Sequence, residues 1–285
     1  MQKYPKISVI TTSFNQCSYL QECIDSVLSQ GYPSLQYIII DGGSTDDSVS
    51  ILKKNEKHLA YWVSEPDGGQ AHAFNKGLAL ADGDLVGWLN SDDYYVGPSL
   101  FEAAHFMTAN ASIDIVFSDY YYVNASSEFL KARKEIPFEY STYLWTVDCY
   151  HANCAGFFRR RVFDRIGGLR EDLQYSMDYD FYLRAAQAGL RFGHVHKWWG
   201  AYRLHEESKT TKAGHMQRKE GRELLTHFAG AGVPPLTFWC KNKAFRSLRV
   251  LRKLFLGSYS NRLKSSKRLS DMPHVGPTAD FCGES

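Results

Sequence analysis

The sequence lacks the features that would place it in a membrane or in a disulfide framework. No run of about 18 uninterrupted apolar residues occurs, so we predict no transmembrane helix. The first residues show neither the apolar core nor the small-residue cleavage site of a signal peptide. The six cysteines form no C-x-x-C pair and are not closely and evenly spaced, so a reduced, cytoplasmic protein is expected.

Acidic residues are missing from one long stretch near the C-terminus. Between Leu236 and Leu269 there are ten Lys or Arg residues and no Asp or Glu, which leaves 23 basic and 31 acidic residues elsewhere. Hydrophobic content of 44% and charged content of 22% are typical of a globular domain. We therefore predict an acidic body at residues 1–230 and a basic amphipathic extension at residues 231–285.

Strand and helix signals alternate through the first half of the chain. Alternation of this kind indicates βαβ crossovers, and hence a mostly parallel sheet flanked by helices. Ser18 and Gln21 fit a capping box, which predicts that a helix begins at Ser18. The predicted strands are KISVITTS, QYIIID, LAYWVSE and DLVGWLN, and later strands are expected in IDIVFSDYYYV and CAGFFRRRVF.

Polar residues follow the predicted strands at one place in each unit. They occupy residues 11–15, 41–44, 67–70 and 90–93. Because open parallel sheets bind ligands at the carboxyl ends of their strands, we expect the four segments to line one crevice. A single Asp after a strand is usually a turn or cap residue. Asp92 and Asp93, however, end an apolar strand with hard oxygen ligands that suit a divalent cation beside a phosphate.

The segments ISVITTSFNQCSYLQECIDSVLSQGYPSLQYIIIDGGSTDDS and SEPDGGQAHAFNKGLALADGDLVGWLNSDD resemble the family 2 glycosyltransferases. The resemblance runs from about Lys6 to about Ser208. It implies a GT-A type, Rossmann-like α/β fold. It also implies metal-dependent, inverting transfer of a hexosyl or related sugar from a nucleotide-diphosphate donor to a glycan or lipid-linked acceptor. Such an enzyme would serve cell-surface polysaccharide or glycolipid synthesis.

The resemblance also implies roles for individual residues. Asp92 and Asp93 fall at the family's metal-binding D-x-D motif, and His205 in YRLHEESKT would complete the shell around Mn²⁺ or Mg²⁺. Asn90 stands where a first carboxylate is common. Asp178 occupies the aspartate position of the E-D motif, whose carboxylate removes the acceptor proton.

Donor-side roles follow in the same way. Asp41 resembles the carboxylate that hydrogen-bonds the nucleobase, and Asp67 resembles the residue that faces the nucleoside and phosphates. Arg203 is expected to face the diphosphate, with an internal salt bridge as the alternative, and Lys76 is either a phosphate contact or an exposed helical lysine. The nucleotide-sugar-binding candidates are Thr11, Ser13, Asn15, Asp41, Asp67, Lys76, Asn90, Asp92 and Arg203.

The extension reads as a basic amphipathic helix with two alternative roles. Phe245, Leu248 and Phe255 recur at helical spacing, with Arg249 and Lys253 on the flanks. A helix of this kind either contacts the inner face of a membrane peripherally or packs against the body. Nucleic-acid binding is not expected, because the acidic body would repel it.

Two rival functions remain open at this point. A catalytically silent protein that binds sugar nucleotides or glycans is suggested by Asn90 and by Met177, which replaces the usual glutamate before Asp178. A nucleotidyltransferase would also use carboxylates and Mg²⁺ on a doubly wound sheet. TTSFNQCSY contains neither the glycine nor the lysine of a phosphate-binding loop, which counts against that rival.

Overall fold

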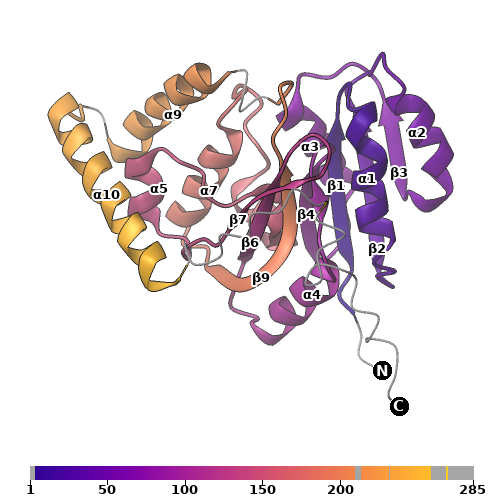
Figure 1. Ribbon diagram of the computed structural model, residues 1–285, viewed down its shortest axis with the longest axis horizontal. Helices are drawn as coiled ribbons and strands as arrows, with labels where there is room; N and C mark the ends of the chain where they lie inside the picture. Colours follow the sequence, from indigo (N-terminus) through magenta and orange to yellow (C-terminus); the bar gives the residue numbers. More distant parts are fainter. Residues whose placement is uncertain (1–3, 209–212, 231, 258–267, 269–285) are drawn as a thin grey trace.

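A single nine-stranded sheet crosses the molecule, and helices cover both of its faces (Figure 1). The computed structural model describes residues 4–208, 213–230, 232–257 and 268. The strand order is β3-β2-β1-β4-β8-β6-β9-β5, and β7 pairs with β6. The strands are β1 (Ile7–Ser13), β2 (Leu35–Asp41), β3 (Tyr61–Ser64), β4 (Leu85–Asn90), β5 (Tyr94–Tyr95), β6 (Ile115–Val123), β7 (Phe129–Arg133), β8 (Gly156–Arg159) and β9 (Phe192–Arg203).

The two halves of the sheet differ in direction. Strands β1 to β4 are mutually parallel, as the alternation of strand and helix signals predicts. Beyond β4 the sheet is mixed, because β8 pairs antiparallel with both β4 and β6, whereas β6 and β9 are parallel. The helices are α1 (Cys17–Leu28), α2 (Ser48–Asn55), α3 (Gln70–Leu80), α4 (Ser99–Ala109), α5 (Tyr140–Thr146), α6 (Arg160–Ile166), α7 (Met177–Gln187), α9 (Gly214–Ala229) and α10 (Pro235–Phe255), with the short 3-10 helices η1 (Glu56–His58) and η2 (Asn153–Ala155).

Alternating side chains along the strands build a core on each side of the sheet. On β2, Ile38 and Ile40 join the core that lies under α3 and α7, while Tyr37 and Ile39 join the core under α1 and α4. All four are buried. This period of two explains why the central strands read as continuous apolar runs, since both of their faces are covered.

Two local predictions are wrong. Helix α1 begins at Cys17, and no capping box forms at Ser18 and Gln21. Instead, Asp46 from the loop before α2 accepts the Cys17 backbone N–H at 2.9 Å, so the helix start is satisfied from a distant part of the chain. The predicted strand CAGFFRRRVF is divided, because only its middle forms β8 and its end forms α6.

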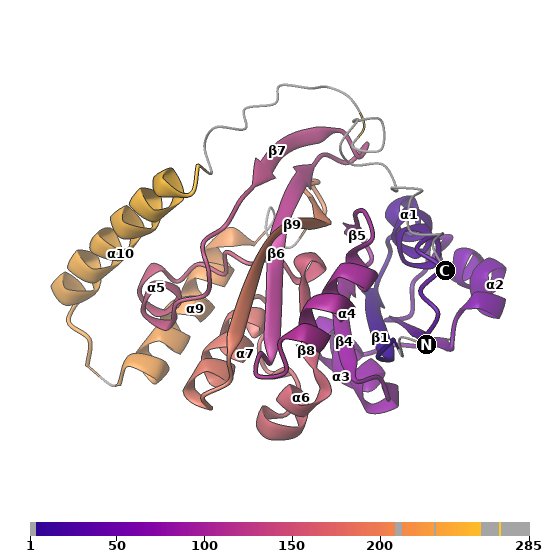
Figure 2. The same cartoon turned by 90° about the horizontal axis from the view of Figure 1, so that it is seen from below.

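The basic extension contains a helix at the outer edge of the molecule. Helix α10 lies beside α5, and both views show it at one end of the structure (Figures 1 and 2). Within the described residues, no helix combines the length and apolar content needed to cross a bilayer. Arg262, Lys264 and Lys267, which contribute to the predicted basic tail, lie outside the described residues.

Candidate active site

A cavity of about 710 Å³ lies at the carboxyl ends of β1, β2 and β4. The polar segments that the sequence places after these strands meet there, as open parallel sheets require. Residues from α7 and α9 close the opposite side. The predicted site residues that line the cavity are Ser13, Asp67, Asn90, Asp92 and Asp178.

The loop after β2 is shaped so that backbone, and not side chain, faces the cavity. Gly42 and Gly43 line it, and a Cβ added to Gly42 would lie 3.0 Å from Asp67 Oδ2. Asp67 Oδ1 in turn accepts the Gly69 N–H at 2.7 Å. Glycine at position 42 therefore lets two loops approach closely and leaves the Asp67 carboxylate at the cavity wall.

Asp41 holds this loop from behind and does not line the cavity. It is fully buried, and its carboxylate accepts the Ser44 N–H at 2.8 Å and the Ser64 hydroxyl at 2.6 Å. These hydrogen bonds lie within the protein, and the expected hydrogen bond of Asp41 to a nucleobase stays a prediction. Asp41 shapes the base-side wall without forming its surface.

Three further donor-side candidates also lie outside the cavity lining. Thr11 is fully buried, with its hydroxyl 3.2 Å from the Tyr37 hydroxyl. Asn15 adopts a left-handed backbone, with φ of 52°, and its Oδ1 accepts the Thr45 N–H at 2.9 Å. Lys76 forms an ion pair with a surface glutamate. Each side chain contacts a neighbour within the protein, and its predicted contact with donor stays a prediction.

The residues of the Asn-Ser-Asp-Asp segment after β4 make different contacts. Asn90 Oδ1 accepts Nε2 of Gln70 at 2.7 Å and Nε1 of Trp88 at 3.1 Å, so this amide is fixed at the cavity wall. Asp92 faces the cavity, and its Oδ2 lies 3.2 Å from Nε2 of His205. The imidazole of His205 packs against a tyrosine ring of α1.

Asp93 points away from the cavity into the protein. It is 2% exposed, and its Oδ1 accepts the Arg203 backbone N–H at 2.9 Å. Burial, followed by the nearby Asp92 charge, raises the pKa of Asp93 well above the usual aspartate range. In the structure Asp93 is thus an internal hydrogen-bond acceptor, and its role as a metal ligand stays an untested prediction.

The side chain of Arg203 also makes its hydrogen bonds within the protein interior. Its guanidinium donates to Glu22 at 2.6 Å and to the Ser127 hydroxyl at 2.8 Å, and its Nε donates to the Asp92 carbonyl oxygen at 2.7 Å. It is 1% exposed and does not line the cavity. The alternative of an internal salt bridge is the one observed, and it locks the backbone that carries Asp92.

Asp178 lies at the first turn of α7, across the cavity from the β4 segment. Its Oδ1 accepts the Tyr179 N–H at 2.7 Å. Loss of hydration is the main cause that raises the pKa of Asp178. Raised basicity is the property a carboxylate needs in order to accept a proton from a hydroxyl.

One functional residue was missed by sequence reasoning. Glu220 on α9 accepts three consecutive backbone N–H groups, those of Gln174 at 2.9 Å, Tyr175 at 2.8 Å and Ser176 at 2.7 Å. These are the residues that lead into α7, so a carboxylate from another helix fixes the start of the helix that carries Asp178. No local pattern marks this contact, because its partners are more than forty residues apart.

The Asp92 and His205 pair fits a divalent cation. A carboxylate oxygen and an imidazole nitrogen 3.2 Å apart can both ligate one ion at bond lengths of about 2.1 Å and nearly a right angle. Asp92 keeps its exposure to the cavity, where a bound diphosphate and water would supply further oxygens. Of the three predicted metal ligands, the structure brings these two together and separates Asp93.

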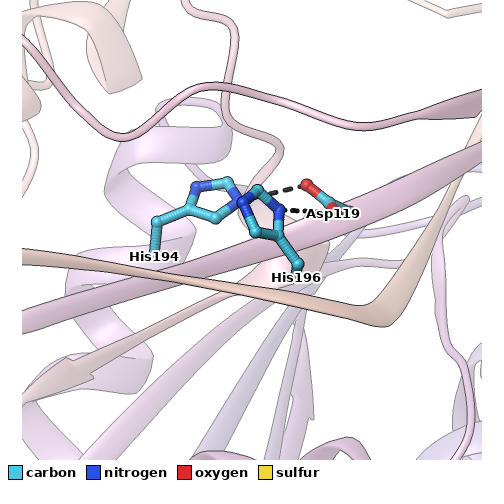
Figure 3. Close-up of side chains that lie close together, drawn as sticks. All are labelled: Asp119, His194 and His196. Atoms are coloured by element: carbon cyan, nitrogen blue, oxygen red, sulfur yellow. Dashed lines mark hydrogen bonds and ion pairs between the residues drawn. The ribbon is translucent and has the colours of Figure 1, made fainter. Parts of the chain in front are cut away.

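A second cluster lies on β6 and β9, away from the cavity lining (Figure 3). His194 Nε2 is 3.0 Å from Asp119 Oδ1, and His196 Nδ1 is 3.1 Å from Asp119 Oδ2. In the part of the chain that the structure describes, these are the three His, Cys, Asp or Glu side chains whose ligand atoms lie close enough together to bind one metal ion. Asp119 also accepts the Glu135 N–H at 2.9 Å. These hydrogen bonds account for the cluster as a link between β6, β9 and the segment after β7.

Comparisons with known proteins agree with this geometry. The sequence profile of the family described as Glycosyl transferase family 2 matches residues 8–167. An uncharacterized glycosyltransferase of Mycobacterium tuberculosis is 36% identical over 188 residues, covering 65% of this chain and 71% of the relative. The hyaluronan synthase of Pasteurella multocida is 26% identical over 222 residues, which cover 77% of this chain but 22% of that enzyme.

Solved structures share the fold at low sequence identity. S. aureus TarS residues 1–349, in complex with UDP-GlcNAc, aligns with a TM-score of 0.63 and 22% identity, covering 90% of this chain and 74% of that one. The mannosyltransferase PcManGT from Pyrobaculum calidifontis, in complex with GDP-Man and Mn²⁺, aligns with a TM-score of 0.61 and 18% identity, covering 91% and 80%. The architecture is that of the GT-A type.

Proposed function

The chain belongs to glycosyl transferase family 2, and from this premise we propose that it transfers a hexosyl or related sugar from a nucleotide-diphosphate donor to an acceptor hydroxyl, with inversion at the anomeric carbon. One observation carries the proposal. Asp92, whose carboxylate lies beside His205, and Asp178 line one cavity that is large enough for a sugar nucleotide.

The donor side binds the nucleotide and diphosphate. The backbone of Gly42 and Gly43, with Asp67, forms the wall on which the nucleoside rests. Asp92 and His205 would hold Mn²⁺ or Mg²⁺, which supplies positive charge that stabilises the departing diphosphate. PcManGT, which shares the fold, was solved with Mn²⁺. Asn90, held by Gln70 and Trp88, keeps a polar wall without adding charge.

The acceptor side removes a proton. Asp178 takes the proton of the acceptor hydroxyl as the oxygen attacks the anomeric carbon from the face opposite the leaving group. The Tyr179 N–H, which donates to Oδ1 of Asp178, helps to hold the carboxylate in one orientation. Attack from that face is what inverts the anomeric configuration.

The acceptor is proposed to be a glycan or a lipid-linked sugar in cell-surface polymer assembly. Relatives that include the hyaluronan synthase of Pasteurella multocida support a polysaccharide context. We propose residues 1–230 as the catalytic unit and residues 231–285 as an extension. Action at the inner face of a membrane belongs to the same proposal, because a lipid-linked acceptor is presented there.

A thermal-shift screen tests the donor site. Melting temperature is measured with UDP- and GDP-sugars, with and without Mn²⁺, because a ligand that binds only the folded state stabilises it by mass action. We expect one nucleotide class to raise the melting temperature, more strongly with Mn²⁺ for the wild type than for His205→Ala. If no nucleotide sugar stabilises the protein under either condition, the donor-site assignment is wrong.

Product analysis separates the transferase from its rivals. Incubation of a stabilising donor with the enzyme releases nucleoside diphosphate if the glycosidic bond is broken. A silent binding protein would bind donor and release nothing. A nucleotidyltransferase would break the bond between the two phosphates, transfer the nucleoside monophosphate to an acceptor and release sugar 1-phosphate. Anomeric configuration of the transferred sugar, read by NMR, tests inversion.

A further inference from the structure

Helix α10 is attached to the body by buried cations and by apolar side chains. Arg249 and Lys253 are buried against Glu135, which is itself fully buried. Glu135 lies 3.1 Å from Nη2 of Arg249 and 2.6 Å from Nζ of Lys253, and Asp148 forms a further ion pair with Arg249. Phe238 and Phe245 of α10, and Leu256 directly after it, are partly buried and pack against the core. The inward side of the helix is therefore mixed in character and takes up only part of its apolar residues.

The opposite side of α10 is apolar and open. Both views place the helix at the edge of the molecule, with the body on one side only (Figures 1 and 2). Spacings of three and four residues put its large exposed side chains on one broad face. Six of them are between 46% and 91% exposed: Leu236, Trp239, Val250, Leu251, Leu254 and Phe255.

An apolar helix face of this extent marks a contact with something outside the described chain. The charged residues beside this face indicate the chemistry of that partner. Lys243 lies over the ring of Trp239 within the face. Lys241 and Arg246 flank the face and also contact α5, where Lys241 lies over the Trp145 ring and Arg246 donates to the Thr146 carbonyl oxygen. From Leu236 to Leu269 the sequence has no acidic residue. A second copy of the same helix would bring like charges together, which disfavours self-association.

We propose that this face docks the protein on an anionic lipid surface, with α10 lying in the plane of the interface. Trp239 and Phe255 suit the boundary between headgroups and acyl chains, and the lysines suit anionic headgroups. The ion pairs at Glu135 fix the helix to the body, so membrane contact orients the whole molecule. This inference stands on the helix surface and does not depend on the proposed transfer reaction.

Vesicle flotation of the full chain tests the proposal. We expect the wild type to float with vesicles of phosphatidylcholine mixed with phosphatidylglycerol, and much less with phosphatidylcholine alone. The variant Leu254→Ser/Phe255→Ser should bind at least tenfold more weakly, because two exposed apolar side chains no longer enter the lipid. The variant Lys241→Gln/Lys243→Gln should lose about fivefold per charge removed.

A matched control replaces exposed apolar residues elsewhere. Leu80 and Leu130 are 42% and 49% exposed on other elements, so Leu80→Ser/Leu130→Ser should float like the wild type. All variants should keep the wild-type melting temperature, since every substituted side chain is exposed. Equal flotation of Leu254→Ser/Phe255→Ser and wild type would overturn the proposal. So would a vesicle-independent dimer that the same variant abolishes.

Discussion

Asp178 combines two properties at the scale of a single side chain, since it faces the cavity yet its carboxylate has lost much of its hydration. Its charged form is therefore less favourable in the folded protein than in water. The same feature that raises its basicity also costs stability at neutral pH. Such a residue is expected where a proton must be accepted.

Replacing Asp178 by Asn should raise stability and abolish transfer. Because the pKa of Asp178 is raised in the folded state, its contribution to stability is full below the usual aspartate pKa and is lost as pH rises through the folded pKa. The asparagine variant has no ionisable group at position 178, so it does not lose this stability as pH rises. We expect a melting temperature a few degrees above wild type at pH 7, and an unchanged melting temperature at acid pH. A lower melting temperature at pH 7 would contradict the account.

The pH dependence of the reaction should report the same group. Transfer requires the deprotonated carboxylate, so kcat/KM should fall as pH falls through the raised pKa of Asp178. The acid limb is thus expected above the ordinary aspartate value of 3.8. A profile that stays flat down to that value would show that Asp178 is not the base.

The sequence located most cavity segments correctly but misjudged several side chains within them. Asp41 and Arg203 lie beside the site, as predicted, yet both point into the protein. Their partners, Ser64 and Glu22, come from other elements of the fold. Motif position determines where a backbone lies, whereas tertiary hydrogen bonds determine which way the side chain turns.

At the scale of helices, α9 supports the start of α7 through one carboxylate. Glu220 satisfies three N–H groups that precede Asp178. Glu220→Ala should reduce the unfolding free energy by about 1–2 kcal/mol and lower kcat, because the turn that carries the base loses its acceptor. Glu223→Ala on the exposed face of the same helix is the matched control and should change neither quantity. Equal effects of the two substitutions on kcat would exclude a positioning role.

The anchor of α10 is a second contact between elements that can be tested by stability. Glu135→Ala leaves Arg249 and Lys253 buried, and Arg133 half-buried, without their shared carboxylate, and should cost about 3–5 kcal/mol. Glu139→Ala removes the half-buried carboxylate that pairs with the exposed Arg252 and accepts the Thr142 hydroxyl, and should cost about 1 kcal/mol. Chemical denaturation measures both. Similar losses for the two variants would mean that the buried cluster does not hold the helix.

Helical spacing in the extension predicted α10 but not its orientation. The alternatives were a membrane-facing helix and a helix packed on the body. The structure shows packing through Arg249 and Lys253 together with Phe238, Phe245 and Leu256, while the large exposed apolar side chains face outward. Sequence alone could not assign the faces, because the buried carboxylate of Glu135 that pairs with both cations lies more than one hundred residues earlier.

At the scale of the whole molecule, the ends of the parallel strands β1, β2 and β4 meet residues of α7 and α9 at one cavity, where we propose the donor and acceptor sides to lie. Apolar runs and helical periods predicted β1 to β4 and the helices between them. The weaker patterns of β5, β7, α4 and α9 gave no prediction, since short or irregular elements depend on the contacts that enclose them. The comparisons confirm the family and the GT-A fold.

Release of nucleoside diphosphate from a bound sugar donor, measured with acceptor for wild type and for Asp178→Asn, tests the central claim most directly. We predict that the variant binds donor with the wild-type melting shift, because Asp92 and His205 are intact. Its rate of release should fall by at least about a hundredfold, the contribution expected of a general base. Release at the wild-type rate by Asp178→Asn would contradict the account.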